Sequence, residues 1–99
     1  MPKIKEEIEV IEEIAPPSMY CVILHNDDYT SMEFVVMILR TIFHKNYNEA
    51  EAIMLKIHEK GKARCGLFSK EIARTKANQV KILAKQEEFP LLATVEKDL

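Results

Sequence analysis

The sequence is poor in the residues and patterns that mark several common protein classes. Its 99 residues include only 2 glycines, too few for a Gly-rich phosphate-binding loop, and contain no G-x-S-x-G or H-E-x-x-H motif. No apolar run approaches the roughly 20 residues that span a bilayer. The N-terminus lacks the basic and then apolar pattern of a secretory signal. We therefore expect a cytoplasmic protein with one domain and one modest core.

An excess of positive charge and closely spaced cysteines are also missing. The formal net charge is −2 and the basic residues are scattered, so there is no stripe of Lys and Arg for a phosphate backbone. Nucleic acid is therefore not an expected partner. Cys21 and Cys65 stand far apart, each in a predicted strand, without C-x-x-C or Cys/His spacing. We expect both to be buried thiols that pack in the core.

The first 17 residues differ in composition from the rest. They carry five glutamates against two lysines and end in a double proline. This predicts that residues 1–17 form a flexible acidic N-terminal extension and that residues 18–99 form the folded domain. Ile4, Ile8 and Ile11 fall at helical spacing, which leaves open a short amphipathic helix that docks on a partner.

The folded part predicts three strands and three helices. A strand is indicated at residues 19–25, which are rich in β-branched and aromatic residues. Residues 62–68 alternate as a second strand, and residues 91–96, after Pro90, indicate a last one. Helix starts are indicated by capping patterns at Thr30 with Glu33, at Asn48 with Glu51, and at Ser69. The helices would end at about Phe43, at Lys60 before Gly61, and before Pro90.

The predicted order is strand, helix, helix, strand, helix, strand. Three strands cannot bury both faces of a sheet with helices this short. The sequence therefore predicts an α+β fold in which three helices pack on one face of a small three-stranded antiparallel sheet.

The turn after the first strand carries the most suggestive polar cluster. Asn26, Asp27 and Asp28 could simply bond nearby backbone N–H groups, as Asn and Asp often do in turns. If their side chains point outward, they suit an ammonium group, which has three donors and no acceptor. His58 projects from the same helix face as Met54, one turn away. If that face looks toward the turn, Asn26, Asp27 and His58 would form a three-point clamp for one amine.

The residues next to this clamp are apolar and partly flexible. Met32, Val35, Met54 and Ile57 would be neighbours of the clamp, either as core residues or as the wall of a pocket that accepts different side chains. Catalytic alternatives are weak, because adjacent aspartates would point in different directions. A metal site of His25, Asp27 and His58 would lack a ligand pair at i, i+4 spacing. We expect no enzymatic activity, no metal and no cofactor.

Five stretches of the chain, in this order, carry a resemblance to a known family. They are PPSMY at 16–20, VILHNDDYTSMEFV at 22–35, HEKGKARCG at 58–66, ARTK at 73–76 and FPLLATVEK at 89–97. Together they resemble ClpS, the adaptors that deliver N-degron substrates to the AAA+ unfoldase ClpA of the ClpAP protease. The likeness covers nearly everything from residue 16 onward.

The resemblance implies a site for a free N-terminal amino acid. Asn26, Asp27 and His58 would hold the α-ammonium group. A bulky first side chain, Leu, Phe, Tyr or Trp, would enter a pocket formed by Leu24, Asp28, Thr30, Met32, Val35, Met54, Ile57 and Leu91. Met32 matches the gate residue that excludes β-branched side chains in the family.

The resemblance also implies how the chain meets its partners. Tyr29, Glu71 and Lys76 would contact the N-terminal domain of ClpA or of a relative such as ClpC, near one edge of the domain; from the residues alone, Glu71 and Lys76 are solvated charges. The extension at 1–17 would be engaged during substrate hand-over. We expect a monomer whose partners are this unfoldase and N-degron-bearing substrates, with no membrane contact.

Two positions depart from the family pattern. Ser31 replaces a common proline at the first helical position and should loosen the helix start without removing its cap. His25 replaces an apolar residue, and strand alternation should turn it away from the clamp, opposite Leu24. The alternative is an interaction module of the same fold that serves another machine and does not need a free α-amine.

Overall fold

A computed structural model of the chain describes residues 18–98. The elements, in order, are β1 (Tyr20–His25), α2 (Met32–Thr41), α3 (Tyr47–Lys60), β2 (Lys62–Phe68), α4 (Lys70–Gln86) and β3 (Leu92–Lys97). This is the predicted order. The acidic extension at 1–17, with its alternative helix, lies outside the described residues.

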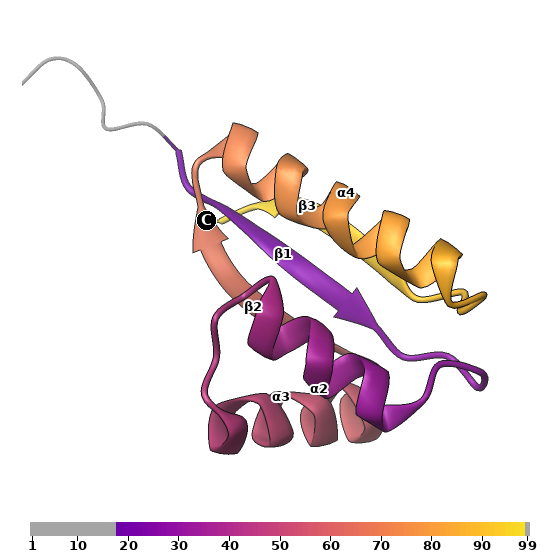
Figure 1. The fold of residues 1–99 in the computed structure, drawn as a ribbon. Coiled ribbons are helices and arrows are strands. Elements are labelled where there is room, and N and C mark those ends of the chain that lie inside the picture. The colour runs from indigo at the N-terminus through magenta and orange to yellow at the C-terminus, as the bar shows by residue number, and fades with distance from the viewer. Residues whose placement is uncertain (1–17, 99) are drawn as a thin grey trace, which may run out of the picture.

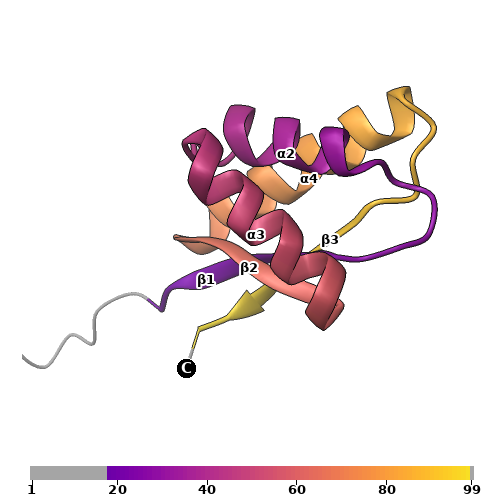
Figure 2. The same ribbon diagram turned by 90° about the horizontal axis from the view of Figure 1, so that it is seen from below.

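The strands form one antiparallel sheet with β1 in the centre. The strand order is β2-β1-β3, and β1 pairs antiparallel with both neighbours. Figures 1 and 2 show α2, α3 and α4 together on one face of this sheet. The predicted fold class is therefore confirmed.

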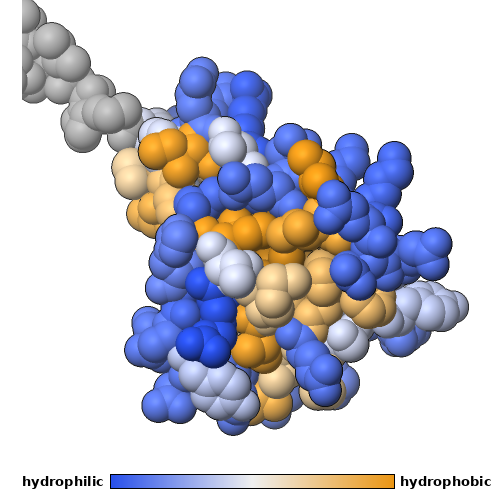
Figure 3. All heavy atoms as spheres, in the orientation of Figure 1, coloured by the Kyte–Doolittle hydropathy of each residue, from blue (hydrophilic) through white to orange (hydrophobic). Residues whose placement is uncertain are grey.

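The core lies between β1 and the helices. Val22 and Leu24 of β1 are fully buried and join one cluster with Ile38 and Leu39 of α2 and Val80 of α4. Each such side chain contributes roughly 1.5–3 kcal/mol when it is fully buried. On the helical face, apolar side chains also reach the surface between α2 and α4 (Figure 3). The core therefore holds the middle of β1 in place, and the candidate site begins just after the C-terminal end of this strand.

Both cysteines are buried and neither forms a disulfide. Cys21 and Cys65 are each 1% exposed. Burial raises the pKa of the Cys65 thiol to about 12. The interpretation of the cysteines as packed thiols is confirmed.

Strand β2 breaks the alternation that its sequence predicts. The pairing of β1 with β2 shifts between Val22 and Ile23, so that Val22 faces Gly66 while Ile23 faces Arg64. Ala63 and Cys65 face the core, so strict alternation would turn Phe68 to the opposite face. The bulge shifts the alternation by one residue and lets Phe68 pack against the core. Gly66 makes room for it, because a Cβ at Gly66 would lie 2.5 Å from the Phe68 ring.

Two of the predicted helix starts are wrong by one or two residues. The N-cap of α2 is Ser31, whose hydroxyl accepts from the N–H of Phe34, and not Thr30. The capping box of α3 joins Asn46 to Glu49 instead of Asn48 to Glu51. For α3, the Asn-x-x-Glu pattern occurs at both Asn46 and Asn48, and the helix uses the earlier one. Ser69 caps α4 and Gly61 ends α3, as predicted.

No helix within residues 18–98 combines the length and the apolar character needed to cross a bilayer.

Candidate functional site

The site begins at the loop of residues 26–31, which joins β1 to α2. Asp27 holds this loop together with three hydrogen bonds. Its Oδ1 accepts from the N–H of Tyr29 at 2.8 Å and of Thr30 at 2.7 Å, and its Oδ2 accepts from the Thr30 hydroxyl at 2.7 Å. A carboxylate offers about four acceptor sites, so roughly one site on Oδ2 is left for another donor. Asp27 therefore bonds to nearby backbone N–H groups, and it also keeps the capacity to accept a hydrogen bond from an external donor such as an ammonium group.

These hydrogen bonds also keep Asp27 ionised. Partial burial by itself raises the pKa of Asp27, but the hydroxyl and N–H of Thr30 and the N–H of Tyr29 outweigh it and hold the pKa below its ordinary value. The loop therefore presents a fixed negative charge at neutral pH.

A backbone contact ties this loop to the end of α3. The N–H of Asn26 donates to the carbonyl of Gly61 at 2.8 Å, and the N–H of Gly61 donates to the carbonyl of Ile57 at 2.9 Å. Gly61 has a φ of 91°, a left-handed conformation that suits glycine. The link brings the last turn of α3, which carries His58, to the turn that carries Asn26 and Asp27.

The two segments enclose a cavity of about 250 Å³, which we call the small cavity. Its lining residues are Asn26, Asp27, Asp28, Thr30, Met32, Val35, Met54, Ile57 and His58. The three predicted amine-binding residues thus share one cavity with six of the eight residues predicted for the pocket. The polar members lie in the loop and at His58, and the apolar ones come from α2 and α3.

Two predicted pocket residues do not line the small cavity. Leu24 is fully buried in the core beneath the helices, and Leu91 is 7% exposed and lines a different hollow beside α4. Both belong to the core cluster that also contains Val35 and Ile57 of the cavity wall. The structure therefore places them within that cluster and outside the lining.

The predicted unfoldase contacts do not lie together. Tyr29 lines a hollow at the C-terminal end of α4, whereas Glu71 lies in the first turn of the same helix. Lys76 is half-buried: its Nζ donates to the carbonyl of Ile42 at 2.7 Å and lies 5.4 Å from the centre of the Phe68 ring. The interpretation of Lys76 as a solvated charge is wrong, because the side chain bonds to the end of α2.

The two departures from the family pattern have clear structural outcomes. His25 Nε2 lies 2.8 Å from the Thr94 hydroxyl on β3, and His25 is not part of the small cavity, in agreement with strand alternation. It is therefore not gathered with Asp27 and His58 as a metal ligand. Ser31 was expected to loosen the helix start, but it is the N-cap itself.

Sequence reasoning missed the part that Thr30 and Gly61 play. Thr30 was interpreted as a helix cap, yet its N–H and hydroxyl both bond to Asp27. The D-x-x-T spacing is a signal that could have shown this. Gly61 contributes its carbonyl to Asn26, and no side-chain pattern reveals a backbone contact between segments this far apart.

A small sheet covered by helices on one face, with a polar loop and an apolar cavity at the end of its central strand, defines a binding module. A family profile described as ATP-dependent Clp protease adaptor protein ClpS matches residues 15–94, so the chain belongs to the ClpS adaptor family. The family consists of adaptors of a protease and not of proteases.

Individual relatives agree with this assignment. The chain is 55% identical over 82 residues to the ATP-dependent Clp protease adapter protein ClpS of Desulforapulum autotrophicum, covering 83% of this chain and 79% of that relative. It is 54% identical to the ClpS adapter of Shewanella loihica, covering 86% and 83%. The structure of Agrobacterium tumefaciens ClpS2 bound to L-phenylalaninamide matches with a TM-score of 0.81 at 36% identity. The match covers 84% of this chain and 100% of the Agrobacterium chain.

Proposed function

We propose that this adaptor binds N-degron substrates through their free, bulky hydrophobic N-terminal residue and delivers them to the ClpA unfoldase of the ClpAP protease or to a related Clp unfoldase. The observation that carries the proposal is the convergence of nine predicted residues on the small cavity. At about 250 Å³ the cavity is slightly smaller than the ~300–1,000 Å³ typical of sites for drug-sized molecules, which suits a single amino acid. The phenylalaninamide bound to the Agrobacterium relative is an amino acid of this kind, with a free amine and a blocked carboxyl group.

In this proposal the polar rim holds the α-ammonium group. Asn26 and His58 each offer an acceptor, and Asp27 adds the fixed charge and its remaining acceptor site on Oδ2. An ammonium group has three donors, so the three residues satisfy it completely. An acetylated terminus loses its charge and two of these donors, and it should therefore bind poorly.

The apolar wall holds the first side chain. Met32, Val35, Met54 and Ile57 supply the contacts, and Met32 at the edge is 48% exposed, where a gate residue must stand. A buried Leu or Phe side chain contributes roughly 1.5–3 kcal/mol and each hydrogen bond to a charged group roughly 1.5–3 kcal/mol. These few contacts suffice for micromolar affinity, which is about −8 kcal/mol.

Delivery requires a second surface that the unfoldase contacts. We propose Tyr29, Glu71 and Lys76 for this role, with the extension at 1–17 engaged during hand-over. Because Lys76 also bonds to Ile42, a variant at Lys76 must be tested for folding before a loss of delivery is assigned to a lost contact. A monomeric state and a cytoplasmic location belong to the same proposal.

The test of substrate binding is a titration followed by fluorescence anisotropy. A labelled peptide that begins with Leu is titrated with the full chain beside its Nα-acetylated twin. We expect micromolar or tighter binding that acetylation abolishes. Equal binding of both peptides, or of neither, would overturn the proposal.

A further inference from the structure

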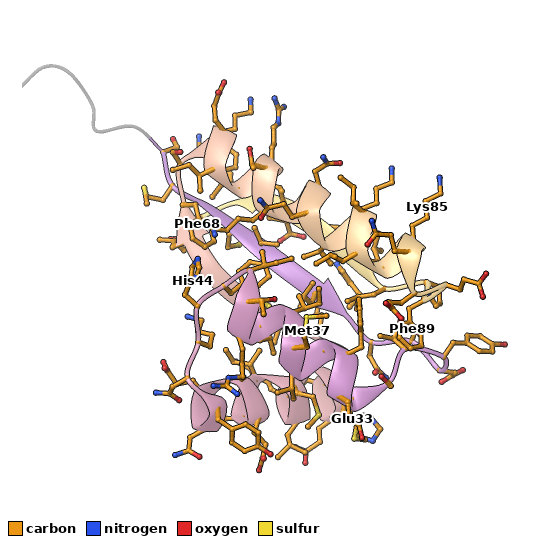
Figure 4. The ribbon with its side chains drawn as sticks, in the orientation of Figure 1. Glu33, Met37, His44, Phe68, Lys85 and Phe89 are labelled. Carbon is orange, nitrogen blue, oxygen red and sulfur yellow. The ribbon has the colours of Figure 1, made fainter. Side chains whose placement is uncertain are left out.

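A second, larger hollow lies on the other side of the 26–31 loop. It has a volume of about 1,130 Å³ and runs between the C-terminal half of α4 and the start of β3. Its wall includes Tyr29, Ala77, Lys81, Lys85, Phe89 and Leu92. We call it the α4–β3 groove. Figure 4 shows Lys85 and Phe89 at one end of the molecule, away from His44 and Phe68 at the other.

The groove and the small cavity share the loop as a common wall. Asp28 and Thr30 line the small cavity, whereas Tyr29 between them lines the groove. Adjacent residues are only about 3.8 Å apart from Cα to Cα, so the two hollows are separated by the width of one loop. A chain that leaves the small cavity has to pass this loop to enter the groove.

The charge changes sign from one hollow to the other. The small cavity carries Asp27 and Asp28. The charged residues of the groove are two lysines, Lys81 and Lys85, against the single carboxylate of Glu88, and all three are exposed. The floor between them is apolar, with Ala77, Ala84 and Leu91 from the inner side of α4 and the start of β3.

We infer that the α4–β3 groove receives the residues that follow the N-terminal residue of the same substrate chain, and that Lys81 and Lys85 favour acidic side chains there. The inference rests on the proposed function and extends it to a second part of the substrate. The small cavity of about 250 Å³ has room for the first residue only, so the rest of the substrate must run over the surface. An extended chain advances roughly 3.3 Å per residue, and it therefore crosses the loop within about two or three residues. Acidic side chains should consequently help from about the fourth residue onward.

The test compares peptides that differ in charge beyond the third residue. Each peptide begins Leu-Ala-Ala, carries Glu-Glu, Ser-Ser or Lys-Lys at positions four and five, and bears a label at its C-terminus. With the full chain at low salt, where surface charges are least screened, we expect the Glu-Glu peptide to bind about three- to tenfold more tightly than the Lys-Lys peptide. The preference should shrink at 0.5 M salt.

A pair of matched variants assigns the preference to the groove. The double variant Lys81→Glu/Lys85→Glu should reverse the order of the peptides. The control Lys62→Glu/Lys97→Glu changes the net charge by the same amount at two exposed lysines that do not line the groove, and it should keep the wild-type order. Competition by leucinamide, which occupies the first position alone, should be the same for all three proteins.

The outcomes separate this inference from the proposed function. Reversal in the groove variant alone supports the inference. Equal binding of all three peptides, or an equal shift of the peptide affinities in both double variants, overturns the inference. If leucinamide still binds in that case, the role proposed for the small cavity stands. If leucinamide does not bind at all, both the inference and the proposed function are wrong.

Discussion

The small cavity and the α4–β3 groove are built in different ways, although one loop separates them. The small cavity is framed by hydrogen bonds that fix the loop, three of them to Asp27 and one from Asn26 to Gly61. The groove is lined at its edge by exposed side chains, namely Tyr29, which is 79% exposed, and the exposed Lys81 and Lys85. A fixed acceptor costs little entropy to use, whereas a long lysine side chain loses rotamer freedom when it is held. We therefore expect strict selection in the small cavity and only an adjustment of affinity in the groove.

Replacement of Asp27 should have the largest effect on peptide affinity, and it should act on the small cavity. Asp27→Ala removes the charge and all three hydrogen bonds of the loop, and we expect roughly a hundredfold weaker peptide binding. Asp27→Asn keeps an oxygen for the N–H groups of Tyr29 and Thr30 but removes the charge, so a loss of about tenfold is expected. Anisotropy titrations measure both. Wild-type affinity in the two variants would show that the ammonium group is held elsewhere.

Gly61→Ala should weaken the link between the loop and α3. The residue has a φ of 91° and no atom near its missing Cβ, so the cost is backbone strain of about 1–2 kcal/mol. Urea unfolding measures this loss, and peptide affinity should fall severalfold if Asn26 shifts. Gly66→Ala is the control, because its Cβ would clash with Phe68 and reduce stability far from the small cavity. Equal peptide binding by both variants would mean that the Asn26 link does not position the clamp.

Met32→Ala should change selection without removing binding. The side chain is 48% exposed, so folding stability should change by less than about 1 kcal/mol. Peptides that begin with Val or Ile should now bind, while a Leu peptide binds about as well as before. Competition against a labelled Leu peptide gives the comparison. Continued rejection of Val and Ile would place the gate at another residue.

Tyr29→Ala should distinguish binding in the groove from binding in the small cavity, with a smaller effect on affinity than the replacements above. Tyr29 lines the groove and not the small cavity, so leucinamide should bind unchanged and a ten-residue peptide should bind up to about threefold more weakly. A loss of leucinamide binding would contradict the division into two hollows. Because only the backbone N–H of Tyr29 bonds to Asp27, the loop should keep its shape.

The smallest effect should appear in the pH dependence of stability. The pKa of Asp27 is lower in the fold than its ordinary value, so its contribution to stability is complete above the ordinary value of about 4 and is lost as the pH falls through the lower folded value. The contribution should be small because the carboxyl group is only partly buried. Melting temperatures from pH 6 to pH 2 should show a slightly steeper acid decline in the wild type than in Asp27→Asn. Parallel curves would contradict the lowered pKa.

The sequence was a good guide where side chains decide the structure. Residues 19–25 are apolar on both faces of the strand, and the structure buries Cys21 to Leu24. Ala73, Ala77, Val80 and Ala84 fall at helical spacing, and the structure buries all of them except Ala77, which is partly buried. From the sequence, the convergence of His58 on the Asn26–Asp28 turn follows only if the His58 face of α3 looks toward that turn. It depends on a bond between two backbone groups, Asn26 N–H and Gly61 C=O, that any residue except proline could supply at position 26.

Local competition explains most of the errors. Thr30 and Ser31 are both suitable caps, and the choice between them follows from Asp27, which takes the N–H and hydroxyl of Thr30. The bulge in β2 follows from how Phe68 reaches the core past Gly66. The sequence predicts Lys76 to be a surface charge because no sequence pattern reveals its distant acceptor, the carbonyl of Ile42.

The buried Cys65 has a practical consequence for all of these experiments. Because burial raises the pKa of Cys65 to about 12, its thiol carries very little of the reactive thiolate at pH 7. Cys21 is equally enclosed at 1% exposure, so maleimide reagents should react slowly with either native thiol while the chain is folded. A fluorophore can therefore be attached to a single cysteine introduced on the surface, for instance by Asn78→Cys at the groove, without first removing the natural cysteines.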